Sequence, residues 1–124
     1  MQALFSKLVF APSDLTGYLA CGHLTQLERR VALGVLSKPA AENPEAELVK
    51  RKGEEHERAY LDRLRTGGRT IQEITLEPDL DWERAARETE DAIRAGTDVC
   101  QGVFVDPDGW RGIADFLERQ ADGT

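Results

Sequence analysis

The sequence lacks a long apolar run, because no stretch approaches the roughly 18 consecutive residues that span a membrane as a helix. The N-terminal segment MQALFSKLVFAPSD has one lysine, a short apolar stretch and no small-residue cleavage pattern. These features predict a strand there, not a signal peptide. We therefore expect a cytoplasmic protein with no membrane contact.

Cysteine and positive charge are also scarce. Cys21 and Cys100 are the two cysteines. A disulfide is not expected in the cytoplasm, and two thiolates cannot close a four-ligand zinc or iron–sulfur site. With 16 Lys and Arg against 23 Asp and Glu, the net charge is -7. This balance argues against a protein that grips phosphates by charge alone, but carboxylates can hold divalent cations that meet a phosphate instead.

The length of 124 residues, with 40% apolar and 31% charged residues, indicates one soluble domain with a modest core. Cap and turn residues predict the order strand, helix, helix, strand, helix and hairpin. The expected helices lie at 14–34 (capped by Ser13), at 44–66 (capped by Asn43) and from Asp79 or Asp81 to about 95. The expected strands lie at 4–10 and 69–76, with hairpin strands at 98–105 and 110–118 joined by DPDG. The fold class is therefore mixed α/β, with helices packed on a small sheet that ends in a hairpin. Since a hairpin needs further strands or a helix to pack on, we expect a domain that is cut short.

His56 lies in the charged helix VKRKGEEHERAYLDRL. Val49, Gly53, His56, Tyr60 and Leu64 follow helical spacing, which predicts that the imidazole points toward the core. On this helix alone, a core histidine hydrogen-bonded to a carbonyl, or one at the edge of the stripe, is favoured over a metal ligand.

Asp115 lies in the last predicted strand, where alternation groups it with Ile113 and Leu117. A buried carboxylate has to pair, take a proton or hold a metal. A salt bridge, for example to Arg111, is one interpretation, and metal binding is the other. If the His56 imidazole and the Asp115 carboxylate converge, they suit one Mn²⁺ or Mg²⁺ ion.

Three blocks of the sequence, SDLTGYLACGHLTQLE, KGEEHERAYLDRL and WRGIADFLER, resemble three successive blocks of the RecB-like nucleases. These belong to the PD-(D/E)xK superfamily and are related to the CRISPR-associated exonucleases of RecB type. The resemblance covers nearly the whole chain, in the same order. It implies that residues 1–124 form a single partial nuclease domain, the N-terminal part of a restriction-endonuclease-like fold.

The resemblance also implies roles for individual residues. The His of the GxxHE block and the Asp of the GxxDFL block, here His56 and Asp115, would be metal ligands in Mg²⁺- or Mn²⁺-assisted hydrolysis of DNA phosphodiesters. Cys21 matches one ligand of the [4Fe–4S] cluster that some relatives carry. The residues that follow Asp115, FLERQADGT, contain no lysine, so the acid-x-Lys strand of the family is missing. No cysteine follows Cys100, so we expect no cluster in this chain and little or no activity without a C-terminal remainder of the nuclease.

Other interpretations stay open. The chain is alternatively a non-catalytic α/β adaptor or pseudoenzyme, with ERRVALG and the charged helix as its partner surface. Redox sensing through Cys21 is a third possibility, although a small buried hydrophobe suits that position equally. Lys50, Arg51, Lys52 and Arg111 are the candidates for DNA contact in the nuclease interpretation, whereas charge runs are more often solvated helix faces.

Overall fold

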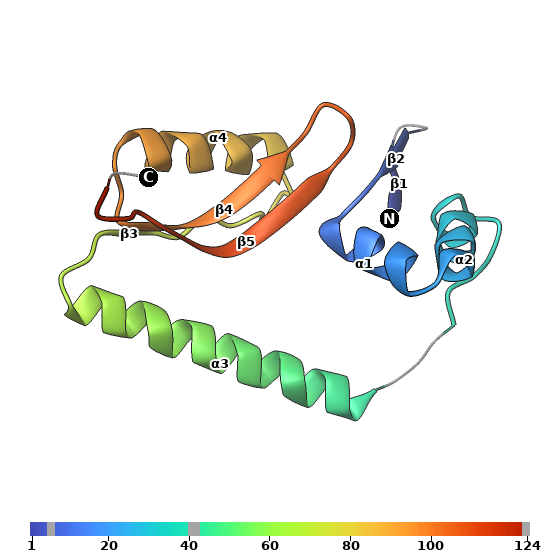
Figure 1. The fold of residues 1–124 in the computed structure, drawn as a ribbon, viewed down its shortest axis with the longest axis horizontal. Helices are drawn as coiled ribbons and strands as arrows, with labels where there is room; N and C mark the ends of the chain where they lie inside the picture. The colour runs from blue at the N-terminus through green and yellow to red at the C-terminus, as the bar shows by residue number, and fades with distance from the viewer. Residues whose placement is uncertain (5–6, 40–42, 123–124) are drawn as a thin grey trace. The chain divides into compact units, whose positions relative to one another are not determined.

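The computed structural model describes residues 1–4, 7–39 and 43–122. Over these residues the fold is mixed α/β, with four helices and two small sheets, as expected (Figure 1). The elements in chain order are β1 (Gln2–Leu4), β2 (Lys7–Val9), α1 (Pro12–Ala20), α2 (Gly22–Ala32), α3 (Pro44–Thr66), β3 (Ile71–Gln72), α4 (Trp82–Arg94), β4 (Val99–Val105) and β5 (Arg111–Glu118).

The chain forms two compact units. Unit 1 consists of Met1–Ala40 with Phe104–Gly112, and unit 2 of Ala41–Val103 with Ile113–Thr124. Each unit is described separately below, and the single partial domain implied by the resemblance stays a prediction.

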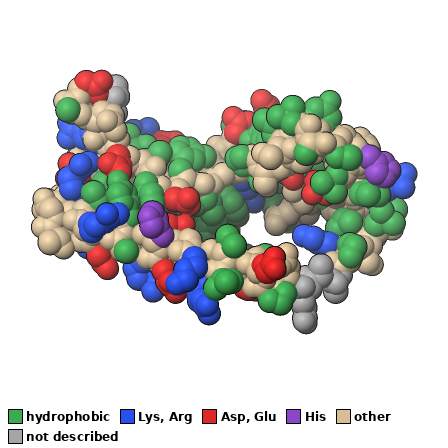
Figure 2. Space-filling view, turned by 60° about the horizontal axis from the view of Figure 1, so that its bottom comes forward, with side chains coloured by type: hydrophobic (Ala, Val, Ile, Leu, Met, Phe, Trp, Pro, Cys, Tyr) green, Lys and Arg blue, Asp and Glu red, His purple; other side chains and the backbone are tan. Residues whose placement is uncertain are grey.

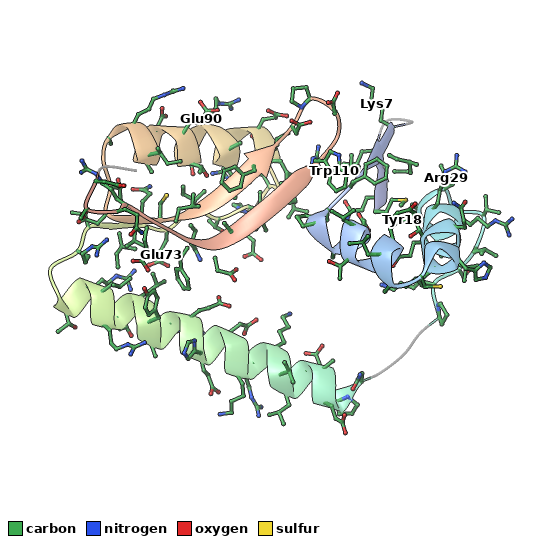
Figure 3. All side chains as sticks on the ribbon, viewed as in Figure 1. Lys7, Tyr18, Arg29, Glu73, Glu90 and Trp110 are labelled. Atoms are coloured by element: carbon green, nitrogen blue, oxygen red, sulfur yellow. The ribbon has the colours of Figure 1, made fainter. Side chains whose placement is uncertain are left out.

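Unit 1 begins with the antiparallel pair β1 and β2, in which Ala3 lies opposite Leu8. The predicted single strand at 4–10 is wrong in this respect, although residues 5–6 lie outside the described residues. Phe10, just past β2, forms a parallel bridge with Trp110, and the two rings lie 5.4 Å apart (Trp110 is labelled in Figure 3).

Two helices replace the predicted helix at 14–34. Cys21 separates α1 from α2 with an extended backbone (φ -161°, ψ 104°), and Gly22 follows it directly. Glycine lowers helix propensity at this point, so the chain can turn there at small cost. The cap of α1 also differs from the prediction, because the N-cap is Ala11 and not Ser13.

The boundaries of α3 match the prediction. The Asn43 side chain accepts a hydrogen bond from the Ala46 amide at 3.2 Å, Pro44 occupies the first turn, and Gly67 caps the C-terminus. The residues of α3 that are not fully exposed are Glu57, Tyr60, Leu61 and Leu64. Their spacing of three and four residues defines the face of the helix that packs.

Unit 2 contains the sheet, in the order β3-β4-β5. β3 pairs with β4 in parallel over two residues only, so most of the strand predicted at 69–76 is absent. The DPDG turn joins β4 to β5 as predicted, with the Asp106 amide bonded to the Trp110 carbonyl at 2.8 Å.

The core of unit 2 lies between α4 and the sheet. Asp81, one of the two aspartates predicted to start this helix, caps α4 by accepting a hydrogen bond from the Arg84 amide at 2.9 Å. The buried cluster comprises Ile74, Ala85, Ala92, Cys100 and Val103, with Leu76, Trp82 and Leu117 packed against it. This is a small core, so single polar contacts inside it matter to stability.

Asp98 ties the start of β4 to the start of β3. Its carboxylate accepts hydrogen bonds from the Thr70 amide (2.8 Å) and hydroxyl (2.7 Å), and the Asp98 amide donates back to the Thr70 hydroxyl at 3.0 Å. The bonds from the amide and the hydroxyl of Thr70 lower the pKa of Asp98. The ionised carboxylate of Asp98 therefore helps to fix the register of β3 against β4.

Gly109 in the hairpin turn provides a first prediction. Its φ is +94°, and a Cβ there would lie 3.1 Å from the Leu8 carbonyl oxygen. We expect Gly109→Ala to lower the free energy of unfolding by about 1–2 kcal/mol, because an L side chain is strained at that φ and crowds the carbonyl. Urea unfolding measures the loss.

The matched control is Gly53→Ala in the middle of α3, where an added Cβ meets nothing within 4 Å among the described residues. This change should raise stability by up to about 1 kcal/mol through helix propensity. Equal effects of the two substitutions would contradict the assignment of strain to Gly109.

Many large apolar side chains are exposed. Among the described residues, fifteen are more than a third exposed, and on α1 Leu15, Tyr18 and Leu19 are 51%, 59% and 77% exposed. Figure 2 shows apolar side chains on the surface, and Tyr18 is labelled in Figure 3. Among the described residues, no helix combines the length and the apolar character that crossing a membrane requires. Apolar surface of this extent marks an interaction site or an incompletely covered core.

Candidate functional site

His56 lies on α3 but outside the face that packs. It is exposed, and so is Val49, which is 71% exposed, whereas the next residue, Glu57, is partly buried. The prediction that the imidazole points toward the core is therefore wrong. The packed face runs through Glu57, Tyr60, Leu61 and Leu64, so it shares Tyr60 and Leu64 with the predicted stripe but includes Glu57 and Leu61 instead of His56.

α3 packs directly against β5 through Tyr60. The Tyr60 hydroxyl donates a hydrogen bond to the Glu118 carboxylate, and its ring meets the Phe116 ring edge-on at 5.0 Å. The Arg63 guanidinium lies 5.5 Å from the centre of the Tyr60 ring. The hydrogen bond to Glu118 is the largest of the effects that raise the pKa of Tyr60, so the hydroxyl stays a donor.

Asp115 precedes Phe116 in β5 and is exposed, as is Ile113 at 59%. The predicted buried carboxylate is therefore wrong, and water can solvate the charge. Phe116 contacts α3, whereas Leu117 packs on the cluster beneath α4. Simple alternation from these neighbours places Asp115 on the face of Leu117, away from Tyr60.

This arrangement does not by itself bring the two expected ligands together. No hydrogen bond or ion pair within the described residues joins His56 to Asp115, and no group of three or more His, Cys, Asp and Glu side chains there is placed to hold a metal. An imidazole and a carboxylate are suitable donors for Mn²⁺, but two protein ligands are few for either ion. Their convergence on one cation stays a prediction that needs a shift of β5 or further ligands.

The two cysteines lie in different environments. Cys21 is exposed at the junction of α1 and α2 in unit 1. Cys100 is buried in the core of unit 2, where burial raises the pKa of its thiol. A buried thiol of raised pKa is a poor metal ligand, which agrees with leaving Cys100 out of a cluster.

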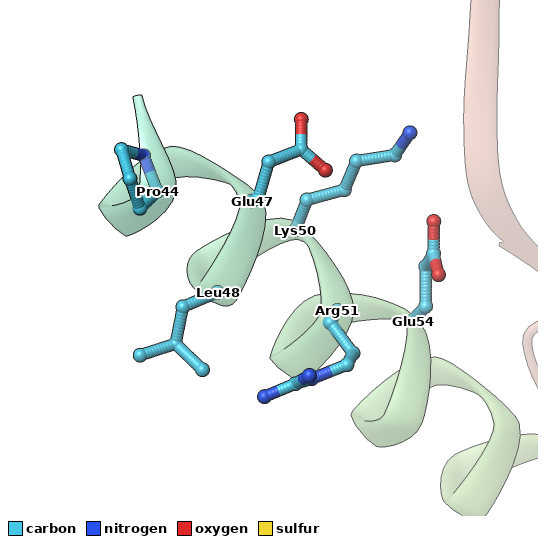
Figure 4. Close-up of a pocket in the computed structure, with 6 residues that line it drawn as sticks. All are labelled: Pro44, Glu47, Leu48, Lys50, Arg51 and Glu54. Atoms are coloured by element: carbon cyan, nitrogen blue, oxygen red, sulfur yellow. The ribbon is translucent and has the colours of Figure 1, made fainter. Parts of the chain in front are cut away.

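The basic residues of α3 do not form a positive groove. Lys50 and Arg51 line an open hollow on the first half of the helix together with Glu47 and Glu54, so the charges of its lining balance (Figure 4). Arg51 and Lys52 both form ion pairs with Glu55, at 4.0 and 2.8 Å. Arg111, the remaining DNA-contact candidate, lies at the start of β5 and belongs to unit 1. Contact with DNA through these residues stays a prediction.

The Tyr60–Glu118 contact could not be predicted from the sequence, because nothing in either local pattern couples residues 58 positions apart. Asp14 is a second such case. It is 8% exposed and forms an ion pair with the N-terminal ammonium at 2.7 Å. No family model, no curated protein and no solved structure matches this chain.

Proposed function

We propose that this chain carries the metal-ligand residues of a metal-dependent DNA nuclease of the RecB-like type. The observation that supports this most is the contact between the two elements that bear the relevant motifs. GEEHE lies on α3 and GIADFL on β5, and the two elements touch through Tyr60, Phe116 and Glu118. His56 precedes Tyr60 by one helical turn on α3, and Asp115 is the neighbour of Phe116 in β5, with its side chain on the opposite face of the strand.

One edge of the sheet is open to a further strand. β5 is the outer strand of the three-stranded sheet in the described residues, and Ile113 and Asp115 are exposed on it. A strand that pairs with this edge would bring further ligands beside Asp115 and cover apolar surface. In the resemblance, the acid-x-Lys strand would supply the third acid and the lysine.

The imidazole of His56 and the carboxylate of Asp115 are ligand types that suit metal-assisted hydrolysis of a phosphodiester. A Mg²⁺ or Mn²⁺ ion held by an imidazole and carboxylates lowers the pKa of bound water and neutralises charge that develops on a phosphate. His56 and Asp115 would contribute to binding that ion, and the lysine that stabilises charge is absent from the sequence after Asp115. We therefore propose a chain that binds Mn²⁺ weakly and hydrolyses little or no DNA without its remainder. Cytoplasmic localisation and a cluster ligand role for Cys21 in the longer parent belong to the same proposal.

Metal binding tests this function. Mn²⁺ should raise the melting temperature of the chain, and His56→Ala and Asp115→Ala should each weaken Mn²⁺ binding by about tenfold or more, because each removes one of few protein ligands. Isothermal titration calorimetry and thermal melts at matched ionic strength measure both effects.

His23→Ala is the matched control, because His23 is the other histidine and is also exposed on a helix, α2. It should leave the Mn²⁺ affinity unchanged. The proposal would be contradicted if Mn²⁺ did not bind the wild-type chain or raise its melting temperature. It would also be contradicted if His23→Ala lowered the Mn²⁺ affinity as much as His56→Ala.

The second candidate function is the non-catalytic adaptor. The exposed apolar face of α1, formed by Leu15, Tyr18 and Leu19, favours it, since such a face suits a protein partner. The adaptor needs no metal, so a negative result in the Mn²⁺ experiment supports it.

A further inference from the structure

Helix α1 presents its large apolar side chains to solvent. Three of them are spaced three and four residues apart and are more than half exposed, and we call them the α1 stripe: Leu15, Tyr18 and Leu19. The residues of α1 that are not exposed are Asp14 and Gly17. Gly17 lies against α2, because a Cβ on it would be 3.8 Å from Glu28 Oε2. A small residue and a polar one therefore face the rest of the unit, while the apolar stripe stays uncovered.

The exposed charges of the same segment are all positive. Residues 12–39 contain two acidic side chains, of which Asp14 is buried and Glu28 is partly buried. The basic side chains of the segment are all exposed, and these are Arg29, Arg30 and Lys38. Within the described residues none of the three forms an ion pair. Their charges are therefore available to carboxylates from another molecule.

Unit 1 differs from unit 2 in its charge. Unit 1 has one more basic than acidic residue, whereas unit 2 has eight more acidic than basic residues. Basic side chains of unit 2 also pair with nearby carboxylates, as Arg51 and Lys52 do with Glu55. The unpaired arginines of α2 therefore lie in the unit where fewer acidic side chains compete for them.

We propose that the helix pair α1–α2 is a docking site for an amphipathic helix of a partner protein, and that the polar face of this helix is acidic. The apolar face of the partner helix covers the α1 stripe, since side chains spaced three and four residues apart on two helices pack as ridges into grooves. Its carboxylates pair with Arg29 and Arg30 on the neighbouring helix (Tyr18 and Arg29 are labelled in Figure 3). Such charge complementarity selects the partner and speeds its association.

An anionic membrane is the other kind of surface that combines apolar and negative groups. A membrane is extended, so the excess negative charge of unit 2 opposes its approach over a Debye length of about 8 Å at physiological ionic strength. The helices α1 and α2 are also short, with 9 and 11 residues. A single partner helix needs to meet only α1 and α2. The observations therefore favour a helical protein partner.

This inference rests on the adaptor candidate and names the chemistry of its partner. Arg29 and Arg30 belong to the ERRVALG segment that the adaptor interpretation uses. Docking needs no metal, and the site lies in unit 1, whereas His56 and Asp115 belong to unit 2. Binding is therefore measured in EDTA, so that its failure and a failure of Mn²⁺ binding are separate results.

Fluorescence anisotropy with the full chain and a labelled designed peptide of about 20 residues tests the proposal. The peptide has leucine at helical positions i, i+3, i+4 and i+7 and glutamate on its polar face, and a second peptide has lysine in place of glutamate. We expect the acidic peptide to bind with a Kd of roughly 10–100 µM and the lysine peptide to bind at least tenfold more weakly. Leu19→Ser should weaken binding of the acidic peptide about fivefold or more, and Arg29→Gln combined with Arg30→Gln about tenfold.

Ile93→Ser is the matched control, because Ile93 is an apolar residue that is 55% exposed on α4 of unit 2. It should leave the affinity unchanged. Leu15→Ser replaces Leu19→Ser if circular dichroism shows that the latter variant is unfolded. The inference is overturned if the acidic peptide does not bind, if the lysine peptide binds equally well, or if Leu19→Ser has no more effect than Ile93→Ser. Binding to phosphatidylserine vesicles but not to the acidic peptide would also overturn it, in favour of a membrane.

Discussion

Replacing Thr89 by valine should destabilise unit 2 by about 1–3 kcal/mol, the cost of leaving a buried amide without its acceptor. Thr89 is 2% exposed on α4, and its hydroxyl accepts the Val103 amide at 2.9 Å while donating to the Ala85 carbonyl at 2.9 Å. Valine keeps the shape of the side chain but offers neither bond. Chemical denaturation measures the loss, and hydrogen exchange at the Val103 amide shows where it arises.

The Val103 amide needs the Thr89 hydroxyl as its acceptor because β3 is short. The Val99 amide bonds to the Thr70 carbonyl at 3.1 Å, and β3 pairs with β4 only as far as Cys100. Amides two residues apart point to the same edge of a strand, so the Val103 amide leaves β4 on that edge beyond the end of β3. The hydroxyl of Thr89 takes the place of the missing strand.

Thr89→Ser is the matched control for this prediction. It keeps the hydroxyl and removes one methyl group, which should cost about 1 kcal/mol. Val103 amide exchange should therefore be fast in Thr89→Val and close to wild type in Thr89→Ser. If the serine variant loses as much protection as the valine variant, the hydroxyl is not the acceptor that matters.

The largest effect in unit 1 should come from Asp14→Asn, with a loss of about 3 kcal/mol at pH 7 because the buried ammonium loses its counter-charge. Burial alone would raise the pKa of Asp14. The hydrogen bonds from the Met1 ammonium and the Ala11 amide, together with the attraction of the ammonium, outweigh burial and lower it below the ordinary value of 3.8.

The direction of this shift sets the pH dependence. Since the folded-state pKa is lower than the unfolded one, the carboxylate of Asp14 contributes its full stability above pH 3.8, and that stability is lost as the pH falls through the folded value. Exchange of the Ala11 amide, corrected for intrinsic rates, should therefore accelerate in this acidic window in wild type. In Asp14→Asn the corrected rate should be high already at pH 7 and change little on acidification.

Asp98 and Asp79 in unit 2 also have lowered pKa values, so unit 2 loses stability in acid as well. Hydrogen exchange at the Ala11 amide distinguishes the acid response of unit 1 from that of unit 2, because Ala11 belongs to unit 1. Asp108→Asn, an exposed turn position of unit 1, should follow the wild-type profile. If the corrected exchange rate of the Ala11 amide in wild type did not change with pH, Asp14 would not form the ion pair with the ammonium in solution.

The sequence alone determined the boundaries of α3, α4, β4 and β5 to within about one residue. Asn43 with Pro44 and the DPDG turn set a helix start and a turn with a few consecutive residues, and the structure has both where they were predicted. The N-cap of α4 is Asp81, one of the two aspartates that the sequence offered. Cap and turn chemistry is local, because a side chain bonds to an amide two or three residues away. No distant contact is needed to recognise it.

Only the tertiary structure decided which side chains are buried. On α3, apolar and polar residues are mixed, and the contact of Tyr60 with β5 selects Glu57 and Leu61 for the packed face and leaves His56 exposed. The length of β3, the acceptor role of Thr89 and the burial of Asp14 likewise depend on partners that are distant along the chain. Burial is a property of the element opposite a residue, and a periodic pattern on one element cannot specify which element that will be.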